Sequence, residues 1–214
     1  GCVFCQNYDI SQLHYGREVE IDDLVNMMLQ LQNGGCININ FVTPTHVVPH
    51  IIESVQHART KGLTVPIVYN CGGYESVETL KLLEGIIDIY MPDAKYMSPA
   101  SSKRYSLAES YPDVMKSALL EMHKQVGDLE IRGGLATRGL LVRHLIMPNG
   151  VAGSKEIIGF LADKISKNTF INIMEQYRPV FKANRFPEIN RSITVKEYQE
   201  VALYAKELGL RLAD

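Results

Sequence analysis

Segments with strand-like patterns alternate with segments of helical periodicity along this chain, and this alternation limits the fold more than any other feature. Residues 37–42 alternate apolar and polar side chains, as expected of a strand with one polar face. Four further apolar runs have strand-like length and composition, at residues 65–70, 86–91, 140–147 and 170–174. Helical patterns separate these runs, so the sequence predicts βαβ units and a parallel sheet in an α/β fold.

Residues that begin and end helices support this division. Thr45 is expected to cap the helix after the first strand, and Thr194 begins a capping-box pattern before the last helix. Residues 98–127 are expected to form two helices, and residues 129–138 a small hairpin. Because no internal repeat or low-complexity linker is found, residues 1–214 are predicted to form a single domain.

Composition limits the kinds of partner. The 22 basic and 24 acidic residues give a net charge of −2, so we expect no general attraction to nucleic acid or anionic membranes. No apolar run approaches the ~20 residues that cross a bilayer. Four cysteines are too few for a disulfide scaffold in a chain of this length, and a reducing, cytoplasmic setting is expected.

Two of the four cysteines stand close together at the start of the sequence. Cys2 and Cys5 are three positions apart, with Phe4 before the second and Gln6-Asn7 after it. Closely spaced thiolates suit an iron–sulfur cluster, a zinc ion or a redox dithiol, and spacing alone leaves these alternatives open. A zinc site would need two further ligands, such as Cys71 with a histidine.

The run from Cys2 to Ser11 resembles the second half of the radical S-adenosylmethionine (radical SAM) signature, C-x-x-x-C-x-aromatic-C. The sequence Cys-Val-Phe-Cys-Gln-Asn within this run is typical of the group related to pyruvate formate-lyase activating enzymes. The signature has a further cysteine four positions before Cys2, so we expect a fragment that starts inside the motif. The resemblance implies a partial, TIM-like (β/α)6 barrel whose first strand is missing from this chain.

The resemblance also implies an activity and its cofactors. Radical SAM enzymes use a [4Fe–4S] cluster, here held in part by Cys2 and Cys5, to cleave S-adenosylmethionine (SAM). The 5′-deoxyadenosyl radical then abstracts hydrogen from a substrate, which for activating enzymes is a glycyl radical enzyme; an electron donor is also required. A chain with two of the three cysteines is expected to be inactive. The sequence leaves open a non-catalytic α/β barrel domain that binds a nucleotide or a protein partner.

Polar residues follow each predicted strand, and the carboxyl ends of parallel strands form the site in such barrels. Where most relatives carry Gly-Gly-Glu to hold the methionine amino group, this chain has Thr43-Pro44-Thr45. Asp93-Ala94-Lys95 resembles the Asp-x-Lys of activating enzymes. The resemblance implies that the cofactor-binding residues are Phe4, Thr43, Thr45, Asn70, Asp93, Lys95, Arg143, Gln176 and Arg178.

Neighbouring residues of a strand face opposite ways, so only one of Arg143 and His144 can face the site. The forked guanidinium makes Arg143 the stronger partner for a carboxylate. Other candidates have simpler explanations. Cys36 is expected to be a buried apolar residue and Cys71 a mainly structural one. Four histidines on predicted helices are expected at the surface without partners: His46, His50, His57 and His123.

Overall fold

The computed structural model describes residues 1–13 and 15–213, without the side chains at positions 9, 11 and 12. A seven-stranded sheet runs in the order β1-β2-β3-β5-β6-β7, with every neighbouring pair parallel, and β4 pairs antiparallel with β5. The sheet is open, which confirms the predicted α/β fold with a partial barrel. Its strands are Ile39–Val42 (β1), Ile67–Cys71 (β2), Ile89–Pro92 (β3), Glu130–Arg132 (β4), Leu135–Leu145 (β5), Phe170–Met174 (β6) and Arg211–Leu212 (β7).

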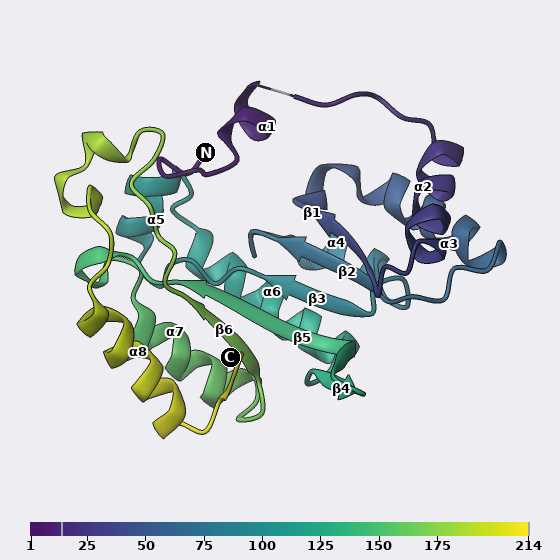
Figure 1. Cartoon of the computed structure of the whole chain (residues 1–214). Helices are drawn as coiled ribbons and strands as arrows, with labels where there is room; N and C mark the ends of the chain where they lie inside the picture. Colours follow the sequence, from purple (N-terminus) through teal and green to yellow (C-terminus); the bar gives the residue numbers. More distant parts are fainter. Residues whose placement is uncertain (14, 214) are drawn as a thin grey trace.

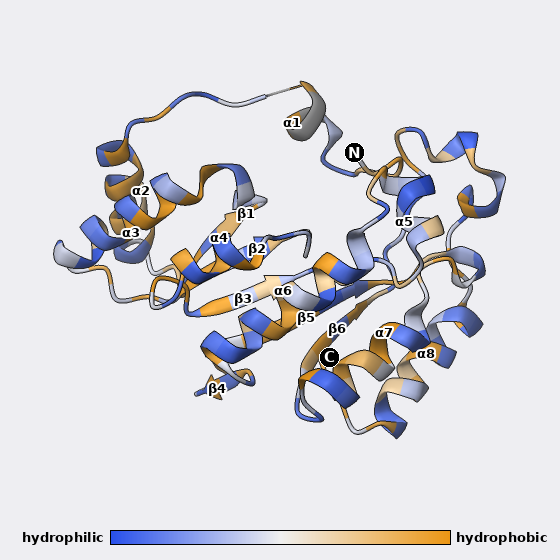
Figure 2. Ribbon diagram, turned by 180° about the vertical axis from the view of Figure 1, so that it is seen from behind, coloured by the Kyte–Doolittle hydropathy of each residue, from blue (hydrophilic) through white to orange (hydrophobic). Residues whose placement is uncertain are grey.

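Helices cover one face of this sheet. Figures 1 and 2 show α4, α6, α7 and α8 on the same side of β2, β3, β5 and β6, while α2 and α3 lie beside β1. Within the described residues, no helix is long and apolar enough to cross a membrane. The α-helices are Tyr8–Leu13 (α1), Ile21–Asn33 (α2), Val48–Thr60 (α3), Val77–Leu82 (α4), Pro99–Ser106 (α5), Tyr111–Val126 (α6), Ser154–Phe160 (α7) and Val195–Glu207 (α8).

The strand predictions hold with shifted ends. Residues 170–174 form β6 as predicted, and the other predicted strands coincide with β1, β2, β3 and β5. β5 is longer than expected because its first residues pair with β4 in the predicted hairpin, which turns at Gly133 and Gly134 with φ of 58° and 81°. The two-residue β7 carries too few side chains to show a strand pattern and was not predicted.

The helix starts give one confirmation and one correction. The capping box at Thr194 is present, because its hydroxyl accepts a hydrogen bond from the Glu197 N–H at 3.2 Å. The prediction that Thr45 caps a helix is wrong. A 3₁₀ turn, Pro44–Val47, precedes α3 and follows Thr43 in left-handed backbone, and the Thr45 hydroxyl donates to Glu75 at 2.7 Å instead.

The two faces of the sheet differ in character. The helix-covered face holds the main core, including Tyr69 and Tyr90, whose rings meet edge to face with centroids 5.8 Å apart. The other face has a small apolar cluster of Val68, Ile89 and Leu129. Two residues further along β2, polar Asn70 follows Val68 on this second face, so its polar side chains lie towards the carboxyl ends of the strands.

Candidate functional site

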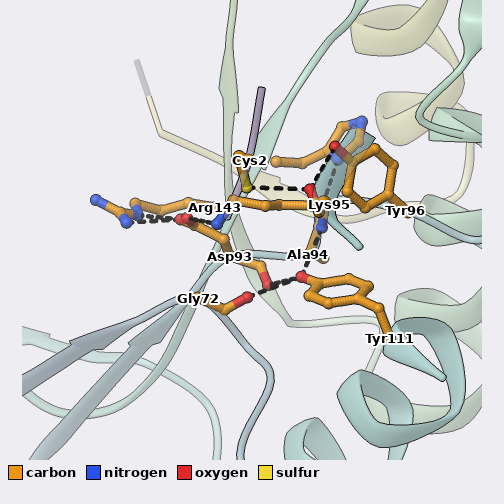
Figure 3. A network of polar contacts seen from close by, with 10 residues as sticks. Cys2, Gly72, Asp93, Ala94, Lys95, Tyr96, Tyr111 and Arg143 are labelled. Atoms are coloured by element: carbon orange, nitrogen blue, oxygen red, sulfur yellow. Dashed lines mark hydrogen bonds and ion pairs between the residues drawn. The ribbon is translucent and has the colours of Figure 1, made fainter. Parts of the chain in front are cut away.

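An acidic side chain lies between two cations where β3 ends. The Asp93 Oδ1 accepts a hydrogen bond from the Arg143 Nε at 2.8 Å and forms an ion pair with Nη2 at 2.6 Å, and Oδ2 accepts a hydrogen bond from the Lys95 Nζ (Figure 3). All three side chains are largely buried, at 15% to 24% exposure. Two cations beside one carboxylate leave one positive charge at this edge of the sheet.

Strand alternation separates Arg143 from its neighbour. His144 is fully buried on the helix-covered face, where its Nδ1 lies 2.6 Å from the Ala94 carbonyl oxygen. A carbonyl only accepts, so Nδ1 carries the proton, and the Ser154 hydroxyl donates to Nε2 at 2.8 Å. Burial lowers the pKa of His144 and keeps the ring neutral. His144 therefore has a structural role, and Arg143 faces Asp93.

Tyr111, the first residue of α6, ties the ends of β2 and β3 together. Its hydroxyl accepts from the Lys95 N–H at 3.0 Å and lies 2.8 Å from the carbonyl oxygens of both Gly72 and Asp93. The chain can pass this closely only because Gly73 has no side chain. At Gly73 φ is +76°, and a Cβ atom would lie 2.2 Å from the Asp93 oxygen. From the sequence, Tyr111 could be placed only near a boundary between two predicted helices, so this role was missed.

The cysteine segment is held by main-chain hydrogen bonds from two sides. The Val3 N–H donates to the Tyr105 carbonyl of α5, and the Val3 carbonyl accepts from the Lys182 N–H, each at 2.8 Å. The Cys5 N–H donates to the Cys2 carbonyl at 3.2 Å, which closes a turn. Such a turn holds its first and fourth Cα atoms within about 7 Å, so both thiols can reach one metal centre.

Cys2 is at the end of a chain of hydroxyl groups. The Ser106 hydroxyl donates to the Cys2 Sγ at 3.0 Å, and the Tyr96 hydroxyl lies 2.9 Å from the Ser106 oxygen (Figure 3). Burial lowers the pKa of Lys95, but nearby Asp93 and Cys2 raise it by more, and it lies above its usual value. Asp93, Lys95 and Arg143 form the Asp93 cluster, and the cysteine segment, residues 2–5, places Cys2 close to it (Figure 3).

These thiols fit part of an iron–sulfur site. Cysteine sulfurs are the usual ligands of such clusters, and hydrogen bonds to them are a common feature. Among the described residues, no three or more Cys, His, Asp or Glu side chains come together as a metal-binding group. Cys2 and Cys5 could therefore supply two ligands of such a cluster, and the described residues around them contain no third thiol.

The remaining cysteines and histidines do not complete a zinc site within the described residues. Cys71 is buried, and burial raises the pKa of its thiol, which disfavours the thiolate that binds metal. The expectation that Cys36 is buried is wrong, because its N–H bonds the Leu31 carbonyl at the end of α2 and its side chain is exposed.

Three of the four histidines are exposed, as predicted: His46, His50 and His57. The expectation for His123 is wrong, because its Nε2 lies 3.0 Å from the Asp128 carboxylate and the side chain is half-buried. His57 also has a partner, Asp22, at 3.8 Å.

Phe4 and the residues after β6 lie around the cysteine segment. The Phe4 ring is buried and meets the Tyr177 ring edge to face, with centroids 5.6 Å apart. This contact anchors the turn in the core, and the adenine contact implied by the resemblance stays a prediction. Gln176 is exposed, and its carbonyl accepts from the Gln6 side chain at 3.3 Å; Arg178 is exposed on the same segment.

A buried carboxylate that the sequence did not single out lies beside β1 and β2. Glu75 is 2% exposed and accepts hydrogen bonds from the hydroxyls of Thr45 at 2.7 Å and Tyr69 at 3.0 Å. Burial raises its pKa. Thr43 lies nearby at the end of β1, where its N–H donates to the Asn70 carbonyl at 2.8 Å. The cofactor contacts implied for Thr43, Thr45 and Asn70 also remain predictions.

Solved structures with the same arrangement of strands and helices identify the fold. A domain of a pyruvate-formate lyase-activating enzyme from Bacteroides vulgatus is 11% identical, with a TM-score of 0.60 over 83% of this chain and 96% of its own. The FeFe-hydrogenase maturase HydG from Carboxydothermus hydrogenoformans is 10% identical, with a TM-score of 0.63 over 97% of this chain and 48% of its own. The fold is that of the radical SAM enzymes.

Sequence comparison adds a relative of this chain. No protein-family model matches the chain. The uncharacterised protein MJ0674 of Methanocaldococcus jannaschii is 30% identical in an alignment of 219 residues, gaps included, that covers 99% of this chain. The chain spans 60% of the length of that relative.

Proposed function

We propose that this chain is the core of a radical SAM enzyme in which Cys2 and Cys5 bind a [4Fe–4S] cluster and the Asp93 cluster binds SAM beside it. The observation that carries this proposal is the cysteine turn, held close to the Asp93 cluster (Figure 3) on a radical SAM fold. When bound, such a cluster supplies the electron that cleaves SAM to methionine and a 5′-deoxyadenosyl radical.

The side chains of the Asp93 cluster would bind and orient SAM. Lys95 and Arg143 together exceed the charge of Asp93 by one unit, which favours the methionine carboxylate. The Asp93 carboxylate is the group suited to the positive sulfonium. Tyr111 and Gly73 keep the Asp93 cluster in place, because the Tyr111 hydroxyl bonds the Asp93 carbonyl oxygen and Gly73 lets the chain pass close to that oxygen.

We base the proposal of a protein substrate on the similarity of this chain to a solved structure. The match to a domain of a pyruvate-formate lyase-activating enzyme supports a glycyl radical enzyme as the partner, with an electron donor to reduce the cluster. The four cysteines, none in a disulfide, are consistent with the cytoplasm as its location.

Anaerobic reconstitution tests the proposed chemistry. The protein is expressed from its whole gene and loaded with iron and sulfide; we expect cluster absorbance and, with SAM and a reductant, release of 5′-deoxyadenosine. C2A and C5A should each lose both signals, whereas C36A, which alters an exposed cysteine, should keep them. A wild-type protein that holds no cluster, or a C2A variant that holds as much as C36A, would refute the proposal.

A further inference from the structure

We propose that a relay of hydroxyl groups, from Tyr96 through Ser106 to Cys2, sets the reduction potential of the cluster, an inference that rests on the function proposed above. Ser106 and Tyr96 belong to none of the motifs in the sequence that suggested a site. They act here as positioning residues, because they reach the cluster only through the sulfur of Cys2.

The direction of the relay follows from hydrogen-bonding capacity. A cysteine thiolate has no proton to donate, so the Ser106 hydroxyl must donate to the Cys2 Sγ, 3.0 Å away. The Ser106 oxygen is then free to accept from the Tyr96 hydroxyl at 2.9 Å. Each hydrogen bond polarises the next, so the two together donate more strongly to sulfur than Ser106 alone.

The Tyr96 donor is fixed in position and in protonation state. Its ring is fully buried and meets the Tyr111 ring edge to face, with centroids 5.7 Å apart. Burial raises the pKa of the Tyr96 hydroxyl well above its usual value, so it stays protonated. The relay therefore starts from a group whose place and proton do not change under ordinary conditions.

A second contact fixes the distance from Ser106 to the sulfur. The carbonyl of Tyr105 accepts from the Val3 N–H at 2.8 Å, while the next residue, Ser106, donates to Cys2. Two consecutive residues at the end of α5 thus hold two consecutive residues of the cysteine segment. A pair of adjacent contacts leaves the Cys2 sulfur little freedom to move away from the hydroxyl.

Hydrogen bonds to a ligand sulfur stabilise the reduced, more negative state of an iron–sulfur cluster and so raise its potential. Removing the Ser106 hydroxyl should therefore make the cluster harder to reduce. A hydrogen bond to a charged acceptor, such as a thiolate sulfur, corresponds to about tenfold or more in an equilibrium constant. For a one-electron reduction, tenfold corresponds to about 59 mV.

A redox titration of the reconstituted whole-gene protein, monitored by electron paramagnetic resonance, tests the relay. We expect the midpoint potential of S106A to fall by about 59 mV, and that of Y96F to fall by a smaller amount. S106T keeps a hydroxyl and should titrate near wild type. S101A removes another hydroxyl from α5 and should not shift the potential, because Ser101 does not contact Cys2 in the described structure.

The outcomes separate this inference from the proposed function. If wild-type protein binds a cluster but S106A and wild type share one midpoint, the relay is refuted and the proposed function stands. If S106A and S106T shift equally, the hydroxyl is not the cause and the relay is also refuted. If wild-type protein binds no cluster, both proposals fail. Thermal unfolding of each variant shows whether a shifted potential reflects a folded protein.

Discussion

At the scale of single residues, the site depends on contacts that join different strands and helices. Asp93 pairs with Arg143 fifty positions away, and Tyr111 ties its main chain to that of Gly72. The sequence could predict that Arg143 and His144 face opposite ways, because strand alternation is local. It could not predict the burial of Glu75, which depends on how Thr45 and Tyr69 meet in the folded chain.

Gly73 offers a test of the close approach beside Asp93. G73A should destabilise the protein by about 3 kcal/mol or more, because a Cβ would overlap the Asp93 carbonyl oxygen and φ is +76°. G85A is the matched control, with the same φ of +76° but nothing within 4 Å of its Cβ, and should cost only about 1 kcal/mol. Urea unfolding measures both; equal losses would show that the overlap does not matter.

At the scale of elements, helix ends carry much of what could and could not be predicted. The capping box of α8 is a local pattern of four residues, and the structure contains it. Its fuller environment is not local: Arg191 donates to both Glu197 oxygens, at 2.9 Å and 2.8 Å, and the Asn149 N–H donates to Oε1 at 2.7 Å. Sequence periodicity contains no information about such contacts from neighbouring loops.

The stability provided by Glu197 should depend on pH. Hydrogen bonds from Arg191 hold the pKa of Glu197 well below its usual value, so its contribution is complete above the unfolded pKa of about 4.3. That contribution is lost as the pH falls towards the lower folded value. E197Q should be about 1–2 kcal/mol less stable than wild type at pH 7, and the difference should shrink below about pH 4.

Thermal or urea unfolding from pH 7 to pH 2 measures this difference. E200Q is the control on the same helix, because Glu200 is half exposed and its Lys196 partner lies 3.9 Å away. Exposed ion pairs of this kind contribute little to the free energy of unfolding, so E200Q should be as stable as wild type at every pH from 7 to 2. A wild-type advantage over E197Q that stays constant to pH 2 would contradict the assigned role.

At the scale of the whole molecule, the parallel sheet was the most predictable feature. Regular alternation of strands and helices favours a parallel sheet, and five of the seven strands were expected from their side-chain patterns. The position of the N-terminal segment was not predictable, since it depends on main-chain bonds to residues 105 and 182. Main-chain contacts of this kind leave no pattern in a sequence.

Because the sheet is open, its strands should differ in how fast their backbone amides exchange hydrogen with solvent. β3 lies between β2 and β5 and is paired on both edges, whereas β1 and β7 are the outer strands. Amides of β3 should exchange slowest and those of β1 and β7 fastest, because opening an outer strand exposes fewer buried contacts. Exchange followed by mass spectrometry checks this order, and β1 protected as strongly as β3 would contradict an exposed edge.

The attachment of Val3 has a consequence for how this loop can vary. Its N–H and carbonyl are the groups that hold the cysteine turn to α5 and to Lys182, and every amino acid except proline carries both. Position 3 can therefore change its side chain while these two main-chain hydrogen bonds are kept. Natural variation there would say little about chemistry, whereas proline would remove the hydrogen bond that holds the cysteine segment to α5.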